Sequence, residues 1–263
     1  NLVVEIYSAP RVTRALELLP SMGLTPGFAL DLTTADSDGR AWDFTDAEMR
    51  KRARTKVAEA KPILLVGSPS CTAYSAWNHL NAVRHAGPEG EEERRRAASD
   101  VHLRFVCELY RLQQDSGRYF LHENPDLATS WSRACMLELM KDQRVQRSTG
   151  DQCQYGQQTK DGRPIKKPTG WMSNSEELLK ALGRRCQARD LGYCSRREGG
   201  AHKPCEGSIA RAAAIYPFKL CKAILTGIRN QLREDKRWHH GRVGILARPE
   251  ERMTYDQLQR CID

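Results

Sequence analysis

A cysteine and a glutamate, each following a strand-like segment, are the residues of this sequence best suited to chemistry. Residues 63–66 (ILLV) have the pattern of a buried strand, and the turn G-S-P-S-C then places Cys71 at its tip. Residues 119–121 form a similar strand, which runs into H-E-N-P with Glu123. A thiolate can attack an electron-poor ring carbon while a neighbouring acid protonates a ring nitrogen. Taken singly, a buried structural cysteine and a turn-forming glutamate are the alternative interpretations.

The elements around these residues predict an α/β fold. Strand-like segments alternate with helical patterns, which is typical of a Rossmann-like, doubly wound and mostly parallel sheet. Ligands of such sheets gather at the carboxyl ends of the strands, where we expect Ser8, Asp31, Asp43 and Cys71. The predicted strands cover 2–7, 28–32, 63–66 and 119–121. The predicted helices cover 11–22, a basic helix capped by Thr45 or Asp46 that extends through Glu59, 100–114, 129–142 and 209–233, the last interrupted near Pro217.

The same patterns predict how the chain is organised. Residues 1–149 form the expected core. The periodicity weakens after Gly150, so 150–208 is predicted to be a small, irregular, cysteine-rich region. A helix at 209–233 returns to the core, and 234–263 is predicted to be a peripheral tail.

The composition of the chain indicates which class of partner it binds and in which cell compartment it occurs. The 263 residues carry a formal net charge of +9, which favours a polyanion such as nucleic acid as partner. There is no apolar run of about 18 residues, so we expect no membrane partner. Nine cysteines in a chain with a sizeable core favour reduced thiols, and hence the nucleus or cytoplasm. The chain starts directly in strand-like sequence, so we expect an excised domain or a processed fragment.

The residues around Cys71 and Glu123 resemble the cytosine-5 DNA methyltransferase family. The stretch S-P-S-C-T-A-Y-S (68–75) followed by E-N-P is similar to its two catalytic motifs, and in particular to those of short phage-type and mobile-element DNA methylases. That group also has C-Q-Y-G, K-P-T, Ser/Thr-Asn and I-x-P-x-x-L-C, which occur here in the same order at 153–156, 167–169, 173–174 and 215–221. The resemblance extends from residue 3 to about residue 228. It implies that 1–149 is the catalytic and cofactor-binding core, that 150–208 is a small target-recognition region, and that the chain is part of a larger polyprotein or a mobile-element product.

The resemblance implies a class I S-adenosylmethionine-dependent methyltransferase that acts on C5 of cytosine in DNA. Cys71 would attack C6 while Glu123 holds and protonates N3, and the target base would be flipped out or single-stranded. RNA is the alternative substrate, because the chemistry on cytosine is the same. The expected nucleic-acid contacts are Ser75, Asn124, Arg163, Lys166 and Lys167; for the last three, an ordinary solvated basic loop is the alternative.

The resemblance also implies a cofactor site, with an acid after the second strand on the ribose and a later acid near the adenine. Turn-forming or helix-capping roles are the alternatives for these acids. The first turn departs from the family, whose glycines let the backbone approach the cofactor, because Y-S-A-P-R contains none. A catalytically degenerate relative that binds nucleic acid or cofactor is therefore a second hypothesis. The expected cofactor-binding residues are Tyr7, Ser8, Ala9, Asp31, Leu32, Asp43, Phe44, Ser68 and Pro69.

Four residues in the glycine-rich region have side chains that bind zinc. Cys186, Cys194, His202 and Cys205 have the spacing C-x7-C-x7-H-x2-C, and a tetrahedral structural zinc would suit them. The spacing matches no common zinc module, and Cys153 is an alternative member of the set. A loop of free thiols is the alternative to a metal site.

Overall fold

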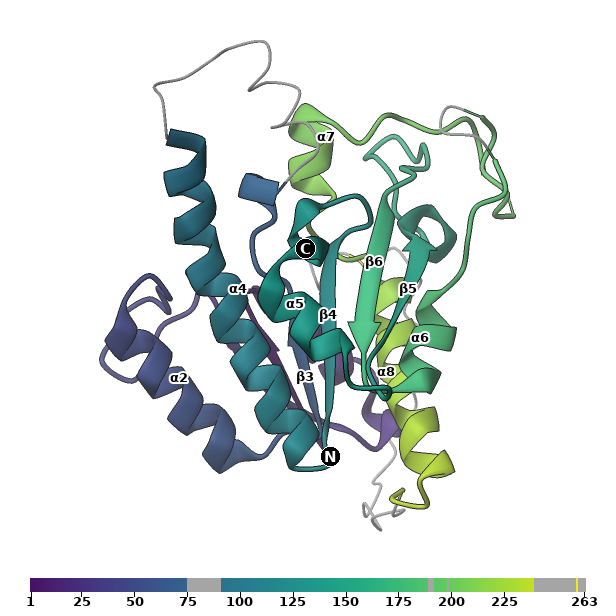
Figure 1. Cartoon of the computed structure of the whole chain (residues 1–263). Coiled ribbons are helices and arrows are strands. Elements are labelled where there is room, and N and C mark those ends of the chain that lie inside the picture. Colours follow the sequence, from purple (N-terminus) through teal and green to yellow (C-terminus); the bar gives the residue numbers. More distant parts are fainter. Residues whose placement is uncertain (75–90, 189–191, 198, 239–258, 260–263) are drawn as a thin grey trace.

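A six-stranded sheet forms the centre of the protein, between two layers of helices (Figure 1). The computed structural model describes residues 1–74, 91–188, 192–197, 199–238 and 259. The strand order is β2-β1-β3-β4-β6-β5; β1 to β4 run parallel, and β6 is antiparallel to both of its neighbours. The predicted α/β class with a mostly parallel sheet is thus confirmed. The strands are β1 (Leu2–Ile6), β2 (Thr25–Leu30), β3 (Leu64–Gly67), β4 (Tyr119–Pro125), β5 (Gln146–Asp151) and β6 (Pro168–Ser173).

Helices cover both faces of the sheet. One layer contains α2, α4 and α5, and the other contains α1, α6 and α8 (Figure 1). No helix within the described part of the chain is both long and apolar enough to cross a membrane. The helices are α1 (Val12–Glu17), α2 (Ala47–Ala60), α4 (Glu91–Asp115), α5 (Ala134–Met140), α6 (Glu176–Leu182), α7 (Gly207–Ala212) and α8 (Phe218–Glu234).

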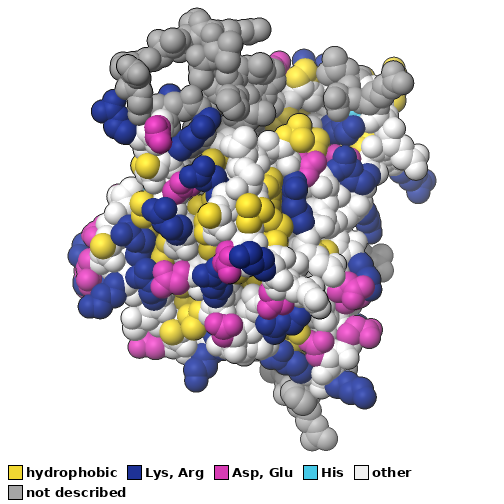
Figure 2. Space-filling view, viewed as in Figure 1, with side chains coloured by type: hydrophobic (Ala, Val, Ile, Leu, Met, Phe, Trp, Pro, Cys, Tyr) yellow, Lys and Arg dark blue, Asp and Glu magenta, His cyan; other side chains and the backbone are white. Residues whose placement is uncertain are grey.

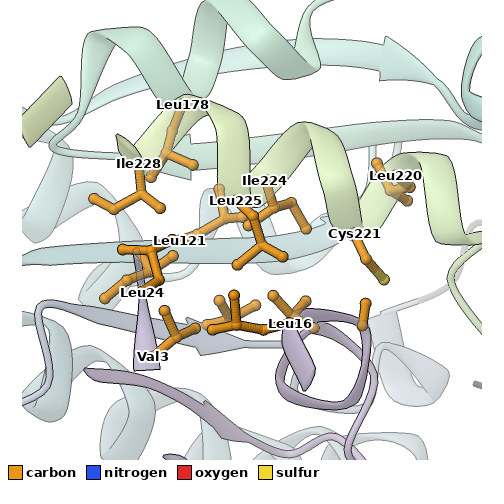
Figure 3. Packing of buried hydrophobic residues seen from close by; sticks show 14 of the residues in the cluster. Val3, Leu16, Leu24, Leu121, Leu178, Leu220, Cys221, Ile224, Leu225 and Ile228 are labelled. Carbon is orange, nitrogen blue, oxygen red and sulfur yellow. The ribbon is translucent and has the colours of Figure 1, made fainter. Parts of the chain in front are cut away.

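Helix α8 supplies one side of the core. Leu220, Ile224, Leu225 and Ile228 recur at helical spacing and are fully buried, so they form a continuous apolar face. This face packs against α1, α6 and the sheet (Figure 3). Helix α8 therefore joins a late segment of the chain to α1 and the first strand.

The other face of the sheet explains why β3 ends in a glycine. Tyr110 of α4 stacks on Phe120, with ring centroids 4.5 Å apart. A Cβ atom on Gly67 would lie only 2.0 Å from the Tyr110 hydroxyl oxygen. The glycine is thus required by close packing at the strand end, and its lack of a side chain lets α4 approach the turn that carries Cys71.

The elements differ from the predicted ones mainly after residue 145. Strands β5 and β6 and helix α6 had no predicted counterpart, and β6 lies inside the sheet although it falls in the expected recognition region 150–208. Helix α4 begins at Glu91, within the charged segment that precedes the predicted helix at 100–114. The predicted helix at 11–22 is interrupted, because Pro20 starts a separate 3₁₀ turn. Most of the expected tail lies outside the described residues.

Candidate functional site

A cavity of about 1030 Å³ opens at the carboxyl ends of the parallel strands. It lies where the chain turns to opposite sides of the sheet after β1 and β3, which is the usual ligand position in open α/β sheets. Both residues expected to perform the chemistry line it, together with most of the expected cofactor-binding turn. The predicted site residues on its wall are Tyr7, Ser8, Ala9, Asp31, Ser68, Pro69, Cys71, Glu123, Asn124 and Lys167.

Cys71 follows β3 on a turn that is held by a hydrogen bond to α4. A 3₁₀ turn at Thr72–Tyr74 comes next, and the Tyr74 hydroxyl donates to Asp100 Oδ1 on α4 at 2.6 Å. The thiol is partly buried. Burial raises the pKa of Cys71 and the Glu123 carboxylate raises it further, whereas Lys167 lowers it. The lysine is therefore the charge that favours the reactive thiolate.

Glu123 extends from β4 into the same cavity, with its side chain 10 % exposed. Among the described residues, no hydrogen-bond donor reaches its Oε1 atom. The Lys167 ammonium lies 3.9 Å from that oxygen and donates a hydrogen bond to the Ala213 carbonyl at 3.1 Å. Lys167, which was expected on a basic loop that contacts phosphates, directly precedes β6 and lies beside the acid on the cavity wall.

The neighbours of Glu123 in the strand, His122 and Asn124, contact each other, and His122 also contacts α4. The His122 imidazole is fully buried, and burial lowers its pKa to about 3, so the ring is neutral. Its Nε2 atom accepts a hydrogen bond from the Asn124 side-chain amide at 2.9 Å, and Nδ1 lies 3.1 Å from the Tyr110 hydroxyl. This arrangement fixes the backbone on both sides of Glu123.

The glycine-free turn after β1 is held by a buried acid. Glu5 is fully buried and accepts hydrogen bonds from the Thr13 backbone and hydroxyl, the Arg11 backbone and the Ser8 hydroxyl, all at 2.8–3.0 Å. Its carboxylate thus satisfies donors at the start of α1. Tyr7 adopts a left-handed backbone conformation with φ of 56°, which glycine ordinarily supplies. The turn is therefore ordered without glycine.

Of the cofactor-binding residues expected after the second strand, only Asp31 lines the cavity. Asp31 lies on the cavity wall; its Oδ1 accepts hydrogen bonds from the Thr33 backbone and hydroxyl, and no donor among the described residues reaches Oδ2. Leu32 is 65 % exposed. The Asp43 carboxylate holds the Thr45 backbone and hydroxyl, which lowers the pKa of Asp43. Neither Leu32 nor Asp43 lines the cavity, and Phe44 is buried against Tyr7, with ring centroids 4.8 Å apart.

A second cluster could hold a metal ion such as zinc. The ligand atoms of Cys153, Cys186, Cys194 and His202 all lie within 4.8 Å of one another, and all four residues are buried. The Cys186 sulfur is 3.9 Å from the Cys194 sulfur and 3.7 Å from His202 Nε2. Cys205, which was expected as the fourth ligand, lies outside the cluster and lines the cavity instead. The expected set is thus corrected, because the turn after β5 brings Cys153 to the position assigned to Cys205.

Hydrogen bonds support the cluster from outside. Gln154 donates to the sulfur atoms of Cys153 and Cys194 at 3.7 and 3.5 Å, and Ser195 donates to the sulfur of Cys186. The buried Asp151 carboxylate accepts the Cys186 backbone N–H at 2.7 Å. Polar groups of this kind orient metal-binding side chains.

The remaining expected nucleic-acid contacts do not converge on the cavity. Arg163 is exposed on the loop before β6, and the Lys166 ammonium donates to the Ala188 carbonyl at 2.8 Å. Ser75 lies outside the described residues. On the face formed by α2, α4 and α5, Lys and Arg side chains alternate with Asp and Glu, so the positive net charge is not concentrated there (Figure 2).

Sequence reasoning missed three residues that shape the site: Glu5, Arg11 and Tyr216. An acid inside the apolar segment LVVEI was the available signal for Glu5, because a buried carboxylate needs partners. Arg11 and Tyr216 carried no such signal. They meet only through the fold, with the Arg11 guanidinium 3.8 Å above the Tyr216 ring.

No protein-family model matches the chain, and a search of curated proteins found no match.

Proposed function

We propose that this protein is an S-adenosylmethionine-dependent methyltransferase acting on C5 of cytosine in DNA. The observation that carries the proposal is that Cys71, on the turn after β3, and Glu123, near the end of the adjacent parallel strand β4, line one cavity together with Asp31 and the first turn. A volume of about 1030 Å³ leaves room for a base beside a second ligand. The resemblance of the two motifs to that family supports the same reaction.

The chain's own residues suit the steps of this reaction. The Cys71 thiolate forms a bond to C6 of cytosine, the ring electron pair moves to C5, and Glu123 supplies a proton to N3. S-adenosylmethionine, when bound, would supply the electrophilic methyl group that C5 receives and would leave as S-adenosylhomocysteine. The C5 proton then passes to a solvent base, the C5–H electron pair re-forms the C5–C6 double bond, and the Cys71 sulfur leaves as thiolate. The N3 proton returns to Glu123, which restores the aromatic ring. Lys167 favours the thiolate at the start of the cycle.

The polar groups on the cavity wall suit the binding of S-adenosylmethionine. Asp31 has a carboxylate oxygen without a donor among the described residues, which suits ribose hydroxyls. The ordered turn at Tyr7–Ala9 supports a binding role for that segment even though it lacks glycine. This observation favours an active enzyme over a degenerate relative.

Oligonucleotides that contain 5-fluorocytosine test the proposal directly. Fluorine at C5 blocks the final elimination, so the enzyme remains covalently attached when S-adenosylmethionine is present. We expect an adduct with wild type that is absent in Cys71→Ala and retained in Cys135→Ser, a partly buried cysteine away from the cavity. Comparing duplex DNA, single-stranded DNA and RNA identifies the substrate. Cofactor binding without an adduct on any of the three would overturn the enzyme proposal and favour a binding module.

We further propose that the four-residue cluster binds structural zinc. A tetrahedral zinc with Zn–S bonds of about 2.3 Å and Zn–N bonds of about 2.0 Å separates its ligand atoms by about 3.5–3.8 Å. The separations of 3.9 Å between two sulfurs and 3.7 Å between sulfur and nitrogen are close to these values. The sulfurs are too far apart for a disulfide, whose S–S bond is about 2.05 Å.

A further inference from the structure

Arg11 places a positive charge on the wall of the cavity. It directly precedes α1 and lines the cavity together with the glycine-free turn after β1. Its Nε atom donates to the Ser8 hydroxyl at 2.7 Å, and its Nη1 atom donates to the Ala214 carbonyl at 2.6 Å. The guanidinium carbon lies 3.8 Å from the centre of the Tyr216 ring. The position of the charge is therefore fixed by two segments that are far apart in the sequence.

Among the described residues, no carboxylate forms a salt bridge with this guanidinium. The buried acid Glu5 is connected to it through the Ser8 hydroxyl, which donates to Glu5 Oε2 at 3.0 Å. The other oxygen of Glu5 accepts from the backbone groups of Arg11 and Thr13. The Nη2 atom of Arg11 has no acceptor within the described part of the chain. Because a guanidinium has five N–H donors, some of them are left for a ligand in the cavity.

The strand order places Arg11 between the two ends of the proposed site. Strands β2, β1, β3 and β4 are neighbours in this order, and the cavity lies at their carboxyl ends. Asp31 follows β2, the segment with Arg11 follows β1, and Cys71 follows β3. A ligand whose ribose meets Asp31 and whose methyl group faces Cys71 therefore passes the segment that carries Arg11.

We infer that Arg11 binds the α-carboxylate of S-adenosylmethionine. The inference rests on the proposed function, in which this cofactor occupies the cavity. The α-carboxylate is the anionic group of the cofactor, and the planar fork of a guanidinium matches the geometry of a carboxylate. The turn Y-S-A-P-R has no glycine that would let its backbone approach the cofactor closely, and Arg11 supplies a side-chain contact in its place.

The charges around Arg11 favour an amino-acid group over the phosphates of a nucleic acid. The cavity wall also carries the carboxylates of Glu17, Asp31 and Glu123. These groups repel a polyanion that approaches the same wall. The amino-acid end of S-adenosylmethionine has an ammonium group beside its carboxylate, so a wall with charges of both signs suits it.

Decarboxylated S-adenosylmethionine, which lacks only this carboxylate, tests the inference by calorimetry. We expect wild type to bind S-adenosylmethionine about 10- to 100-fold more tightly than the decarboxylated form, because a charge-assisted hydrogen bond is lost. In Arg11→Gln this ratio should fall below about threefold, chiefly through weaker binding of S-adenosylmethionine. Arg11→Lys keeps the charge but loses the forked donors, so it should give an intermediate ratio, and it provides the test if Arg11→Gln does not fold.

Arg14→Gln is the matched control. Arg14 also lines the cavity, but its side chain is exposed. Because water screens an exposed charge, the variant should keep the wild-type ratio within about twofold. Loss of the ratio in Arg14→Gln, with the ratio kept in the Arg11 variants, would assign the carboxylate to Arg14 and overturn the inference.

The other outcomes separate this inference from the proposed function. Equal binding of the two cofactor forms by wild type would overturn the inference and leave the proposed function standing. Weaker binding of both forms by the same factor in Arg11→Gln would identify Arg11 as a structural link to Ala214 and overturn it as well. Weaker binding of DNA with an unchanged cofactor ratio would show that Arg11 contacts phosphate instead. If folded wild type binds neither form, the proposed function and the inference fail together.

Discussion

The ammonium of Lys167 lies 3.9 Å from Oε1 of Glu123, and this contact follows from the antiparallel insertion of β6 beside β4. Lys167 directly precedes β6, and Thr169 pairs with Pro125 near the end of β4. The start of β6 therefore lies at the same edge of the sheet as the end of β4. A positive charge is thus placed among the acid, the thiol and the cavity.

The first prediction concerns this charge. Burial and Glu123 raise the pKa of Cys71 while Lys167 lowers it, so Lys167→Met raises that pKa further. The thiolate fraction then falls at any pH below the pKa, and the pH profile of thiol reactivity moves to higher pH. We expect alkylation of Cys71 by iodoacetamide at neutral pH to slow about tenfold, as measured by mass spectrometry of the Cys71 peptide.

Lys166→Met is the control for this experiment, because its ammonium contacts the Ala188 carbonyl and it does not line the cavity. An unchanged alkylation profile in Lys167→Met would show that the lysine does not act on the thiol. The rate for Cys205 should fall too, because Lys167 lowers the pKa of that thiol as well.

The second prediction concerns the cofactor. Asp31→Ala removes the carboxylate with a free oxygen on the cavity wall, and we expect the Kd for S-adenosylmethionine to rise about 10- to 100-fold by calorimetry. Asp43→Ala should weaken binding less, because its carboxylate holds Thr45 and it lies off the cavity wall. A larger effect of Asp43→Ala would place the adenine end of the cofactor outside this cavity.

The third prediction separates the two possible fourth ligands of the metal. We expect one zinc per chain in the purified wild type, measured by mass spectrometry of the metal. Cys153→Ser should lose most of it, whereas Cys205→Ser should keep it, because only Cys153 lies within the cluster. Removal of zinc by a chelator should also lower the thermal stability, since four buried ligands would lose their shared partner. Equal zinc in wild type and Cys153→Ser would contradict the assignment.

The sequence predicted the parallel half of the fold because its strands are short apolar runs that end at turns. Leu64, Leu65 and Val66 are fully buried. A short apolar run of this kind between two helical segments is typical of a central strand in a parallel sheet. The same pattern predicted that Cys71 and Glu123 share one edge of the sheet. The predicted strand at 119–121 was too short, because pairing with β6 extends β4 to Pro125, and Glu123 lies within β4 and not on a turn after it.

The antiparallel half could not be predicted in this way. Strand β5 is an edge strand whose first residues are exposed and polar, and β6 contains Pro168 and Gly170, which weaken a strand pattern. The choice of Cys153 over Cys205 depends on the path of the chain after β5, which spacing along the sequence does not encode. The position of Lys167 beside Glu123 could not be predicted either, because it depends on the pairing of β6 with β4.

The last prediction tests how the glycine-free turn is built. Glu5→Ala would leave the backbone N–H groups of Arg11 and Thr13 and the Ser8 hydroxyl without their buried acceptor. Each unsatisfied buried donor is costly, so we expect the free energy of unfolding to fall by about 3 kcal/mol or more, measured by urea denaturation. Glu59→Ala, at an exposed position of α2, should change it by less than about 0.5 kcal/mol. Because Glu5 orders the turn that lines the cavity, the Kd for S-adenosylmethionine should rise in Glu5→Ala under conditions where the variant remains folded. A stable variant with unchanged cofactor binding would show that the turn holds its shape without the buried acid.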